Sequence, residues 1–330
     1  MTARSPRPRR GVALLAALWL VVAIAAVALQ FSLEAHERRT EGVLAAERGQ
    51  QRALAMGALA LMQEKLDQSL RVAPSGSNPR IAQLAAFDPW MGADSLYSGT
   101  VYVDSLPVLV EVHDLGEKLN VNSATETELQ AFFSFLLKDY SASVQLSQTI
   151  MDWRDADSIP RPNGAERDDY IKAGMLALPT NSTFRTVQEV SQVMGMTPDI
   201  FAEASPYLTT RGNGAINLNT APVPVLRALP AMTDATLNQI LQLRSQGRRI
   251  TDVEEIFPQQ RNGRRGAAGQ VASTQAQAAL AARTTVTTTQ LELTISARIG
   301  REASPSVLTA IIQRAGGQGA GVANITYKQW

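Results

Sequence analysis

An uninterrupted apolar run near the N-terminus constrains this chain more than any other feature. From Val12 to Leu29 all 18 residues are apolar. At about 1.5 Å of rise per residue, a helix of this length nearly crosses a hydrocarbon core of roughly 30 Å. Arginines precede the run at positions 4, 7, 9 and 10, and no acidic residue does. Because basic residues favour the cytoplasmic side, we expect a single-pass membrane helix with the N-terminus in the cytoplasm and the remainder outside it.

Helical periodicity continues beyond the apolar run. Apolar residues recur at steps of three and four, at Ala55, Leu59, Met62, Leu66 and Leu70, with charged residues between them. No proline occurs between Val12 and Ala73. We therefore predict one helix whose residues 12–33 span the membrane and whose residues 34–72 are amphipathic. A cleavable secretory signal is the alternative, but it would have a shorter apolar core that ends in a small-residue site and a turn.

The remainder of the chain predicts an α+β fold. Three segments rich in β-branched residues favour strands, namely Thr100–Val112, Thr284–Ile299 and Ser306–Gln313, although the last could also be helical. A long helix packed on a small antiparallel sheet would account for 73–115 and 284–330. Residues 116–283 are mainly helical in pattern, so we predict a large all-α domain inserted into the sheet domain. Within it, 259–282 is expected to be flexible or weakly helical, and the glycine-rich 316–321 to be mobile.

An internal repeat divides the helical region into two units, near 119–190 and 216–257. Three pairs of segments match in the same order: 119–124 with 216–221, 150–154 with 240–244, and 186–190 with 252–256. Each unit opens with Asn-x-Asn-[Ser/Thr]-Ala, which predicts helix N-caps at Ser123 and Thr220 and a capping box with Glu126. The pattern resembles helix-hairpin-helix units, which often bind DNA phosphates through a glycine-rich hairpin. Here the hairpin at 229–233 has no glycine, so a protein scaffold is favoured over DNA binding.

The first unit carries an acidic insertion. Arg154 and Val190 are 36 residues apart, whereas Arg244 and Ile256 are 12 apart, so the first unit has about 24 extra residues. Asp155, Asp157 and Glu166 stand at positions 1, 3 and 12 of an EF-hand-like spacing, but position 6 is Pro160 where an EF-hand has glycine. An oxygen cage for a hard cation that also draws on Asp152 and Asp169 is one interpretation. A solvated acidic loop is the other.

Composition excludes several kinds of site. The chain has no cysteine and two histidines, so disulfides, thiolate metal sites and cysteine nucleophiles are absent. No Gly-x-Ser-x-Gly, phosphate loop or histidine-rich metal motif occurs. We therefore predict that the protein is not an enzyme. A periplasmic enzyme on a signal anchor, with a catalytic metal in the acidic cluster, is the competing hypothesis.

The N-terminal segment resembles the leader of type IV pilins and pseudopilins. A basic leader ends in Gly11 before Val12, which resembles a prepilin-peptidase site cleaved after Gly11. Most pilins carry glutamate at the fifth mature position, where it is thought to pair with the amine of the neighbouring subunit. Here that position is Ala16. A subunit at the tip of a fibre has no subunit above it, so an apolar residue suits the tip, because an unpaired buried carboxylate is costly.

The internal motifs resemble one branch of that family. The segments 152–157, 164–166 and 216–222, together with Tyr170 and Ala16, are similar to the minor pseudopilin K family of type II secretion. The resemblance implies a long helix, a split pseudopilin sheet and an inserted α-domain that binds structural calcium. It also implies a single pass through the bacterial inner membrane with the soluble domain in the periplasm, prepilin-peptidase cleavage and methylation. It further implies assembly with minor pseudopilins I and J and other pseudopilins at the tip of a fibre that exports folded proteins. No nucleic-acid partner is expected. The alternative is a membrane-anchored helix-hairpin-helix DNA receptor of the competence type.

Overall fold

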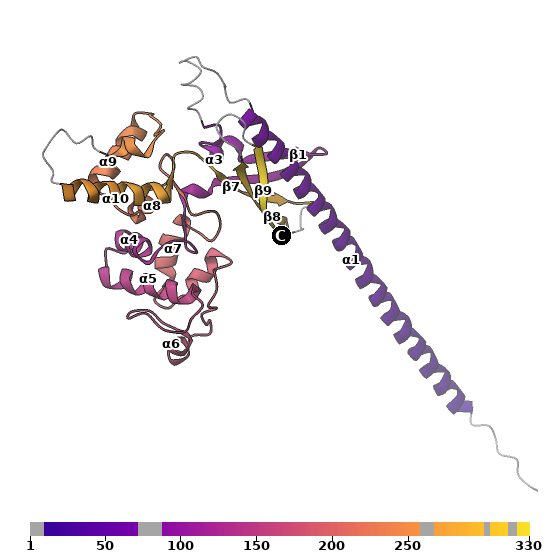
Figure 1. The fold of residues 1–330 in the computed structure, drawn as a ribbon. Coiled ribbons are helices and arrows are strands. Elements are labelled where there is room, and N and C mark those ends of the chain that lie inside the picture. Colours follow the sequence, from indigo (N-terminus) through magenta and orange to yellow (C-terminus); the bar gives the residue numbers. More distant parts are fainter. Residues whose placement is uncertain (1–9, 72–87, 258–266, 300–303, 316–321) are drawn as a thin grey trace, which may run out of the picture.

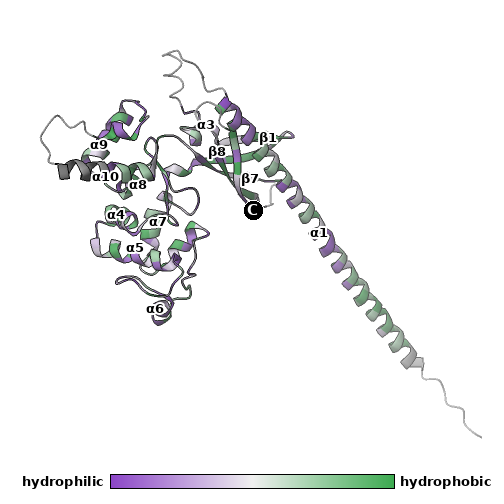
Figure 2. Ribbon diagram, in the orientation of Figure 1, coloured by the Kyte–Doolittle hydropathy of each residue, from purple (hydrophilic) through white to green (hydrophobic). Residues whose placement is uncertain are grey.

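The N-terminal segment is one continuous helix, α1 (Arg10–Arg71), of 62 residues. The computed structural model describes residues 10–71, 88–257, 267–299, 304–315 and 322–330, so residues 1–9 of the expected leader lie outside the described residues. Residues 14–46 of α1 are exposed and extend away from the rest of the protein (Figure 1). The outer end of this part is hydrophobic (Figure 2), and by length and composition α1 includes a stretch able to cross a membrane. The predicted long apolar helix is confirmed.

A five-stranded antiparallel sheet lies beside the C-terminal part of α1. Its strand order is β1-β2-β7-β8-β9, formed by β1 (Gly99–Val103), β2 (Leu106–Asp114), β7 (Gln290–Ala297), β8 (Ser306–Ala315) and β9 (Val322–Gln329). The segment 100–112, predicted as one strand, is a hairpin instead. Its turn residues Asp104 and Ser105 have φ of 48° and 68°, the left-handed pair of a tight hairpin turn. β8 resolves the earlier ambiguity in favour of a strand, and β9 was not predicted.

The apolar face of α1 packs on one face of this sheet. Alternate residues of β2, β7 and β8 point toward the helix and are buried, because successive side chains of a strand face opposite ways. The helix also approaches β1 closely, since a Cβ added at Gly57 would lie 2.8 Å from Val103 Cγ1. The shared core includes Ala55, Ala58, Leu59, Met62, Leu66 and Leu70 of α1 with Val108, Val110, Val112, Leu291, Leu293, Ile295, Leu308, Ala310 and Ile312 of the sheet.

Between β2 and β7 the chain leaves the sheet and forms a helical region with its own hydrophobic core. This region lies on the side of the sheet away from the free end of α1 (Figure 1). Its helices are α4 (Glu126–Leu137), α5 (Tyr140–Arg154), α6 (Arg167–Lys172), α7 (Pro198–Ala204), α8 (Val223–Ala228), α9 (Asp234–Ser245) and α10 (Ala267–Arg283). A short helix α3 (Ala93–Tyr97) precedes β1. The segment 259–282, predicted as flexible or weakly helical, is helical from Ala267, while 259–266 and the predicted mobile segment 316–321 lie outside the described residues.

The two sequence repeats make the same backbone pairings. Short parallel bridges join β3 (Leu119–Asn120) to β4 (Leu208–Thr209) in the first copy and β5 (Ile216–Asn217) to β6 (Thr284–Thr285) in the second. Short 3-10 helices begin within the third matched segment of each copy, η2 (Val187–Gln192) and η4 (Val253–Ile256). Two others are η1 (Leu115–Glu117) and η3 (Ser205–Tyr207). The connection from α5 to η2 contains the acidic insertion.

Matched side chains also have matched roles. Asn122 Nδ2 donates to the Phe184 and Thr210 carbonyls, and Asn219 Nδ2 donates to the Ile250 and Val286 carbonyls. The Arg154 guanidinium donates to the Val121 and Ala124 carbonyls, and that of Arg244 to the Leu218 and Ala221 carbonyls. In each copy the arginine therefore holds the opening turn, and the asparagine of that turn bonds it to later segments of the chain.

The predicted N-caps are wrong. Thr125, not Ser123, caps α4 and forms the capping box with Glu128, not Glu126. In the second copy Pro222 precedes α8 without a side-chain cap, and Thr220 Oγ1 donates instead to Asp114 Oδ2 at 3.0 Å. A helix does follow each predicted cap, but its N-cap position lies two residues later, because Ser123 and Thr220 belong to the turn that the arginine holds.

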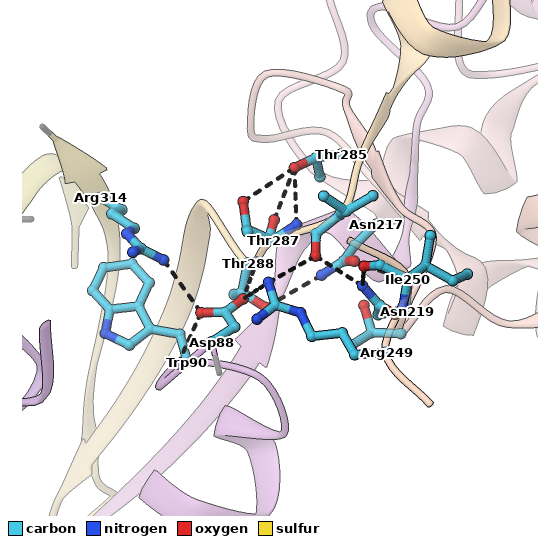
Figure 3. A network of polar contacts seen from close by, with 12 residues as sticks. Asp88, Trp90, Asn217, Asn219, Arg249, Ile250, Thr285, Thr287, Thr288 and Arg314 are labelled. Carbon is cyan, nitrogen blue, oxygen red and sulfur yellow. Dashed lines mark hydrogen bonds and ion pairs between the residues drawn. The ribbon is translucent and has the colours of Figure 1, made fainter. Parts of the chain in front are cut away.

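A buried polar network joins the second copy to the sheet (Figure 3). Asp88 is 2% exposed, and its carboxylate accepts from the Thr288 backbone N–H at 2.6 Å and from Arg314 at 3.3 Å. Thr288 Oγ1 accepts in turn from Asn217 Nδ2 at 3.2 Å. Asp114, at the end of β2, accepts from Asn217, Thr220 and Thr288 side chains. The helical region is thus attached to the sheet by hydrogen bonds at the sites where the chain enters and leaves it.

Candidate cation site

The acidic insertion begins where α5 ends. Asp152 and Trp153 of the last turn are buried, and Asp155 is the C-cap, with its backbone N–H donating to the Met151 carbonyl. The loop then runs to Glu166, which precedes α6. Trp153 stacks on Phe184 at 5.9 Å between ring centroids and meets Tyr170 edge-on at 5.6 Å. These aromatic contacts fix both ends of the loop on the helical core.

The loop brings three of the five predicted ligands together. Asp155, Asp157 and Glu166 each offer a carboxylate oxygen, and these oxygens all lie within 4.8 Å of one another. Asp157 is exposed, Asp155 is half-buried, and Glu166 is only 4% exposed. The spacing that suggested the site therefore does converge, although the loop is not an EF-hand.

The buried oxygens of this triad lack hydrogen-bond donors among the described residues. Both carboxylate oxygens of Glu166 and Oδ1 of Asp155 are buried with no partner of ordinary geometry. Burial raises the pKa of Glu166, and the neighbouring charges of Asp152 and Asp155 raise it further, while the Arg167 backbone amide partly opposes the rise. Because a buried carboxylate without a partner is costly, the triad has the character of a site that is completed by a cation.

Asp152 is not part of the triad and pairs with Arg161. It is fully buried, and its Oδ1 accepts from Arg161 Nη1 at 2.5 Å while its Oδ2 accepts from the Arg161 backbone N–H at 3.1 Å. The same Nη1 donates to Asp155 Oδ2 at 2.6 Å. Gly164 allows this fold of the loop, since a Cβ there would lie 1.8 Å from Asp152 Oδ2.

Asp169 is used differently again. Its Oδ2 accepts from the Glu166 backbone N–H at 3.1 Å, and its Oδ1 lies 3.5 Å from Lys172 Nζ. It is therefore a helix-capping group that holds the Glu166 backbone. Asp152 and Asp169 remain predicted ligands, but in this structure they contact Arg161 and the α6 terminus.

Sequence reasoning missed three residues of the site. Arg161 pairs with two acids, Gly164 permits the close approach, and Asn181 Nδ2 donates to the Asp157 carbonyl. A lone arginine between prolines within an acidic loop was the available signal for Arg161. Of the processing and tip residues, Gly11 and Val12 lie in the first turn of α1, and Ala16 is exposed on its apolar part.

Comparison with known proteins connects the insertion to a family. Residues 111–213, which include the whole acidic loop, match the family described as type II secretion system (T2SS), protein K. In this segment the chain is similar to the type II secretion protein K family, which confirms the resemblance predicted from the sequence.

Two relatives carry that name. Type II secretion system protein K of Dickeya chrysanthemi is 33% identical over 140 residues, which is 39% of this chain and 38% of the relative. The protein of the same name from Pectobacterium carotovorum subsp. carotovorum is 28% identical over 127 residues, 36% of this chain and 38% of the relative. The matches thus span about two-fifths of the length of these relatives.

A solved structure shares the fold. One chain of the crystal structure of the GspK–GspI–GspJ complex from enterotoxigenic Escherichia coli aligns with a TM-score of 0.56 at 16% identity, over 86% of this chain and 98% of that chain. The similarity shows that the arrangement of helix, sheet and helical region is common to both. Neither relative nor this structure is a DNA receptor, so the competence-type alternative gains no support.

Proposed function

We propose that this protein is a minor pseudopilin at the tip of the type II secretion pseudopilus, where it initiates or caps the fibre and supports export of folded proteins. One observation carries the proposal: α1 is packed on the sheet by its C-terminal part only, while residues 14–46 project without a partner in the described chain. A free apolar helix on a pilin-like α+β body is suited first to the membrane and then to the helical core of a fibre. The family match supplies the system in which this occurs.

The tip position is supported by Ala16. A subunit within a fibre needs a group that pairs with the N-terminal amine of its neighbour, and an alanine offers none. The broad helical region beside the sheet also adds bulk that a further subunit would have to pass (Figure 1). We infer that the chain accepts subunits below it and none above.

Processing and orientation follow from the same segment. We infer that prepilin peptidase cleaves after Gly11, that the mature chain begins at Val12, and that everything after the membrane helix is periplasmic. N-terminal sequencing of the membrane-extracted protein checks this. A start at Met1, or one beyond Ala26, would contradict the pseudopilin assignment.

We also infer that the acidic triad holds calcium. The residues fit the ion, because three carboxylates converge, two of them have unpaired buried oxygens, and the group found among the described residues includes no histidine or cysteine. A bound calcium ion would supply positive charge to this cluster. Asp155, Asp157 and Glu166 would hold it, with Asp169 fixing the backbone of Glu166. The role is structural, since the insertion has few large buried side chains of its own.

Thermal unfolding tests the calcium proposal. Calcium added to chelator-treated full-length protein in detergent should raise the melting temperature, because a ligand that binds only the native state stabilises it. Asp155→Asn and Glu166→Gln should abolish the rise, and Asp168→Asn, an exposed acid of the same loop, should preserve it. If wild-type melting curves in calcium and in chelator coincide, the loop is only a solvated acidic segment.

The paired helical repeats are inferred to be helix-hairpin-helix-like units used as protein scaffold. Their matched asparagines and arginines bond the chain's own carbonyls, and the link between α8 and α9 contains Pro230 and Ala231 where a phosphate-binding hairpin would have glycines. No nucleic acid is required by this arrangement.

Co-purification tests the function itself. The protein should form a complex with the I and J pseudopilins of the same bacterium when all three are expressed with prepilin peptidase and extracted in mild detergent. A chain lacking residues 119–283 serves as a control for the contribution of the helical region. Failure to recover I and J with the full-length protein, under conditions in which I and J recover each other, would contradict the assignment.

A further inference from the structure

Arg161 occupies an unusual place beside the acidic triad. Its Nη1 lies 2.5 Å from Asp152 Oδ1 and 2.6 Å from Asp155 Oδ2, and its Nε lies 3.6 Å from Glu126 Oε2 on α4. One nitrogen thus serves an acid that is not in the triad and an acid that is. The other oxygen of Asp155, Oδ1, is buried and unpaired.

The two acids that Arg161 Nη1 contacts depend on it to different degrees. Asp152 is fully buried, and its hydrogen bonds in this structure come from the side chain and backbone of Arg161. Asp155 is half-buried and has a further oxygen available to the triad. Removing a partner from a buried charge is costly, so Arg161 is held in place chiefly by Asp152.

The cluster also has an independent sign of a ligand. Glu166 is 4% exposed, neither of its carboxylate oxygens has a hydrogen-bond partner of ordinary geometry, and one of them lies within 4.8 Å of a carboxylate oxygen of Asp155 and of Asp157. The arginine does not reach Glu166, so the loop contains one neutralised end at Asp152 and one end that is still negative.

We propose that Arg161 is a built-in counter-cation that limits the affinity of the calcium site: it holds one oxygen of Asp155, leaves the other to the ion, and supplies the charge that keeps the loop folded when calcium is scarce. This inference rests on the proposed calcium binding. Arg161 is a positioning residue, not a ligand. Its positive charge repels a dication bound a few ångströms away, and the same charge stabilises Asp152.

The proposal predicts that one substitution lowers the stability of the protein without calcium and raises its affinity for calcium. Arg161→Gln should lower the melting temperature in chelator by roughly 5–10 °C, because Asp152 loses its partner. It should also tighten calcium binding, on the order of tenfold or more, because a like charge has gone and both oxygens of Asp155 become available. A residue that merely supports the fold would weaken both properties.

Matched variants separate charge at this position from charge in general. Arg167→Gln removes an exposed arginine of the same insertion and should change the calcium dissociation constant by less than about twofold, since exposed charges are screened. Arg161→Lys keeps the charge and should bind calcium within a few-fold of wild type. Should Arg161→Gln fail to fold, Asp152→Asn is compared with Asp152→Asn/Arg161→Gln, where the buried acid that Arg161 neutralises is uncharged in both variants, and the double variant should bind calcium more tightly.

The experiment is calorimetric titration of calcium into the chelator-treated full-length chain in detergent, with melting curves of the same samples. A wild-type protein that shows no calcium binding would refute the proposed site itself. Wild-type binding with equal or weaker binding in Arg161→Gln, or in the double variant relative to Asp152→Asn, would leave the site intact and overturn the role of Arg161. Tighter binding with a lower melting temperature in chelator supports it.

Discussion

Replacing Arg244 with methionine should destabilise the opening turn of the second repeat, residues 216–221. Its guanidinium donates to the Leu218 carbonyl from Nε at 3.0 Å and from Nη2 at 2.7 Å, and to the Ala221 carbonyl from Nη1 at 2.7 Å. Methionine keeps much of the apolar stem and removes all three donors. The two carbonyls are then left in a turn whose other bonds come from Asn217 and Thr285.

The magnitude follows from two opposing terms. Three hydrogen bonds from a charged donor are worth about 1.5–3 kcal/mol each, hence roughly 5–9 kcal/mol together. Burial lowers the pKa of Arg244 to about 10, against an ordinary value of 12.5, so keeping the side chain charged in the folded state costs about 3 kcal/mol. The difference, reduced further by water reaching the freed carbonyls, predicts a loss of about 2–4 kcal/mol.

Hydrogen–deuterium exchange of the full-length protein in detergent measures this locally. The amides of Leu218 and Ala221 are bonded in the same turn, so their exchange should accelerate roughly 30- to 700-fold, the equivalent of about 2–4 kcal/mol. Arg248→Met, at an exposed neighbouring arginine, is the matched control and should change stability by less than about 0.5 kcal/mol. Arg244→Met that exchanges like Arg248→Met would refute the assigned role of the arginine.

Three further predictions concern other parts of the chain. Burial, with the charges of Asp94 and Asp114, raises the pKa of Glu117 to about 7 from 4.5, so its contribution to stability is present below pH 4.5 and is lost as pH rises through 7. Glu117→Gln should remove roughly 1–3 kcal/mol of that pH dependence, and identical pH–stability profiles of the variant and the wild type would contradict this. Gly57→Ala should be less stable than Gly49→Ala by about 1–3 kcal/mol, because a Cβ at 57 meets Val103 whereas one at 49 meets nothing, and equal melting temperatures would show that α1 can shift. Ala16→Glu should not improve secretion, since an unpaired carboxylate costs about 2.5–3.5 kcal/mol at a membrane centre, and improved secretion would argue against the tip.

Elements with a strong apolar period were predictable from the sequence. The 62 residues of α1 follow from an apolar run, a three- and four-residue period and the absence of proline. β7 and β8 bury alternate or successive apolar side chains, so their sequence pattern predicts strands. In β9 only Ala323 is buried, because this strand lies at the sheet edge, and an edge strand gives no alternation to detect. The β1–β2 turn was missed because Asp104 and Ser105 take left-handed conformations without a glycine.

The site was partly predictable for a similar reason. Ligand spacing in the sequence identified Asp155, Asp157 and Glu166, because a short loop between two helix ends brings such residues together. It did not separate them from Asp152 and Asp169, which are equally acidic and equally near. That separation depends on Asp152 accepting from both the side chain and the backbone of Arg161, on Asp169 accepting from the Glu166 backbone, and on the fold of the loop at Gly164, and all three are properties of packing.

The duplication confines the expected effect of calcium to one copy. In both copies an arginine at the end of a helix holds the opening turn, but Asp152 is replaced by Gln242 at the matched position of the second copy, and only the first copy has the insertion. The insertion is fixed at its ends by Trp153 against Phe184 and by Tyr170, whose hydroxyl accepts from the Met194 backbone N–H at 2.8 Å. Its middle depends on charge.

Chelation should therefore accelerate hydrogen exchange in residues 155–172 and leave 245–256 unchanged, although the two segments occupy matched positions in the repeat. The reason is that the second connection closes through Asn219 and the Ile250 carbonyl, and its acids Asp252 and Glu255 accept hydrogen bonds from backbone N–H groups in a capping box. Exchange mass spectrometry of the full-length protein in calcium and in chelator compares the two segments in one sample, so the second copy is an internal control. Equal acceleration in both segments would show that calcium stabilises the helical region as a whole, and the argument for a local structural cation would fail.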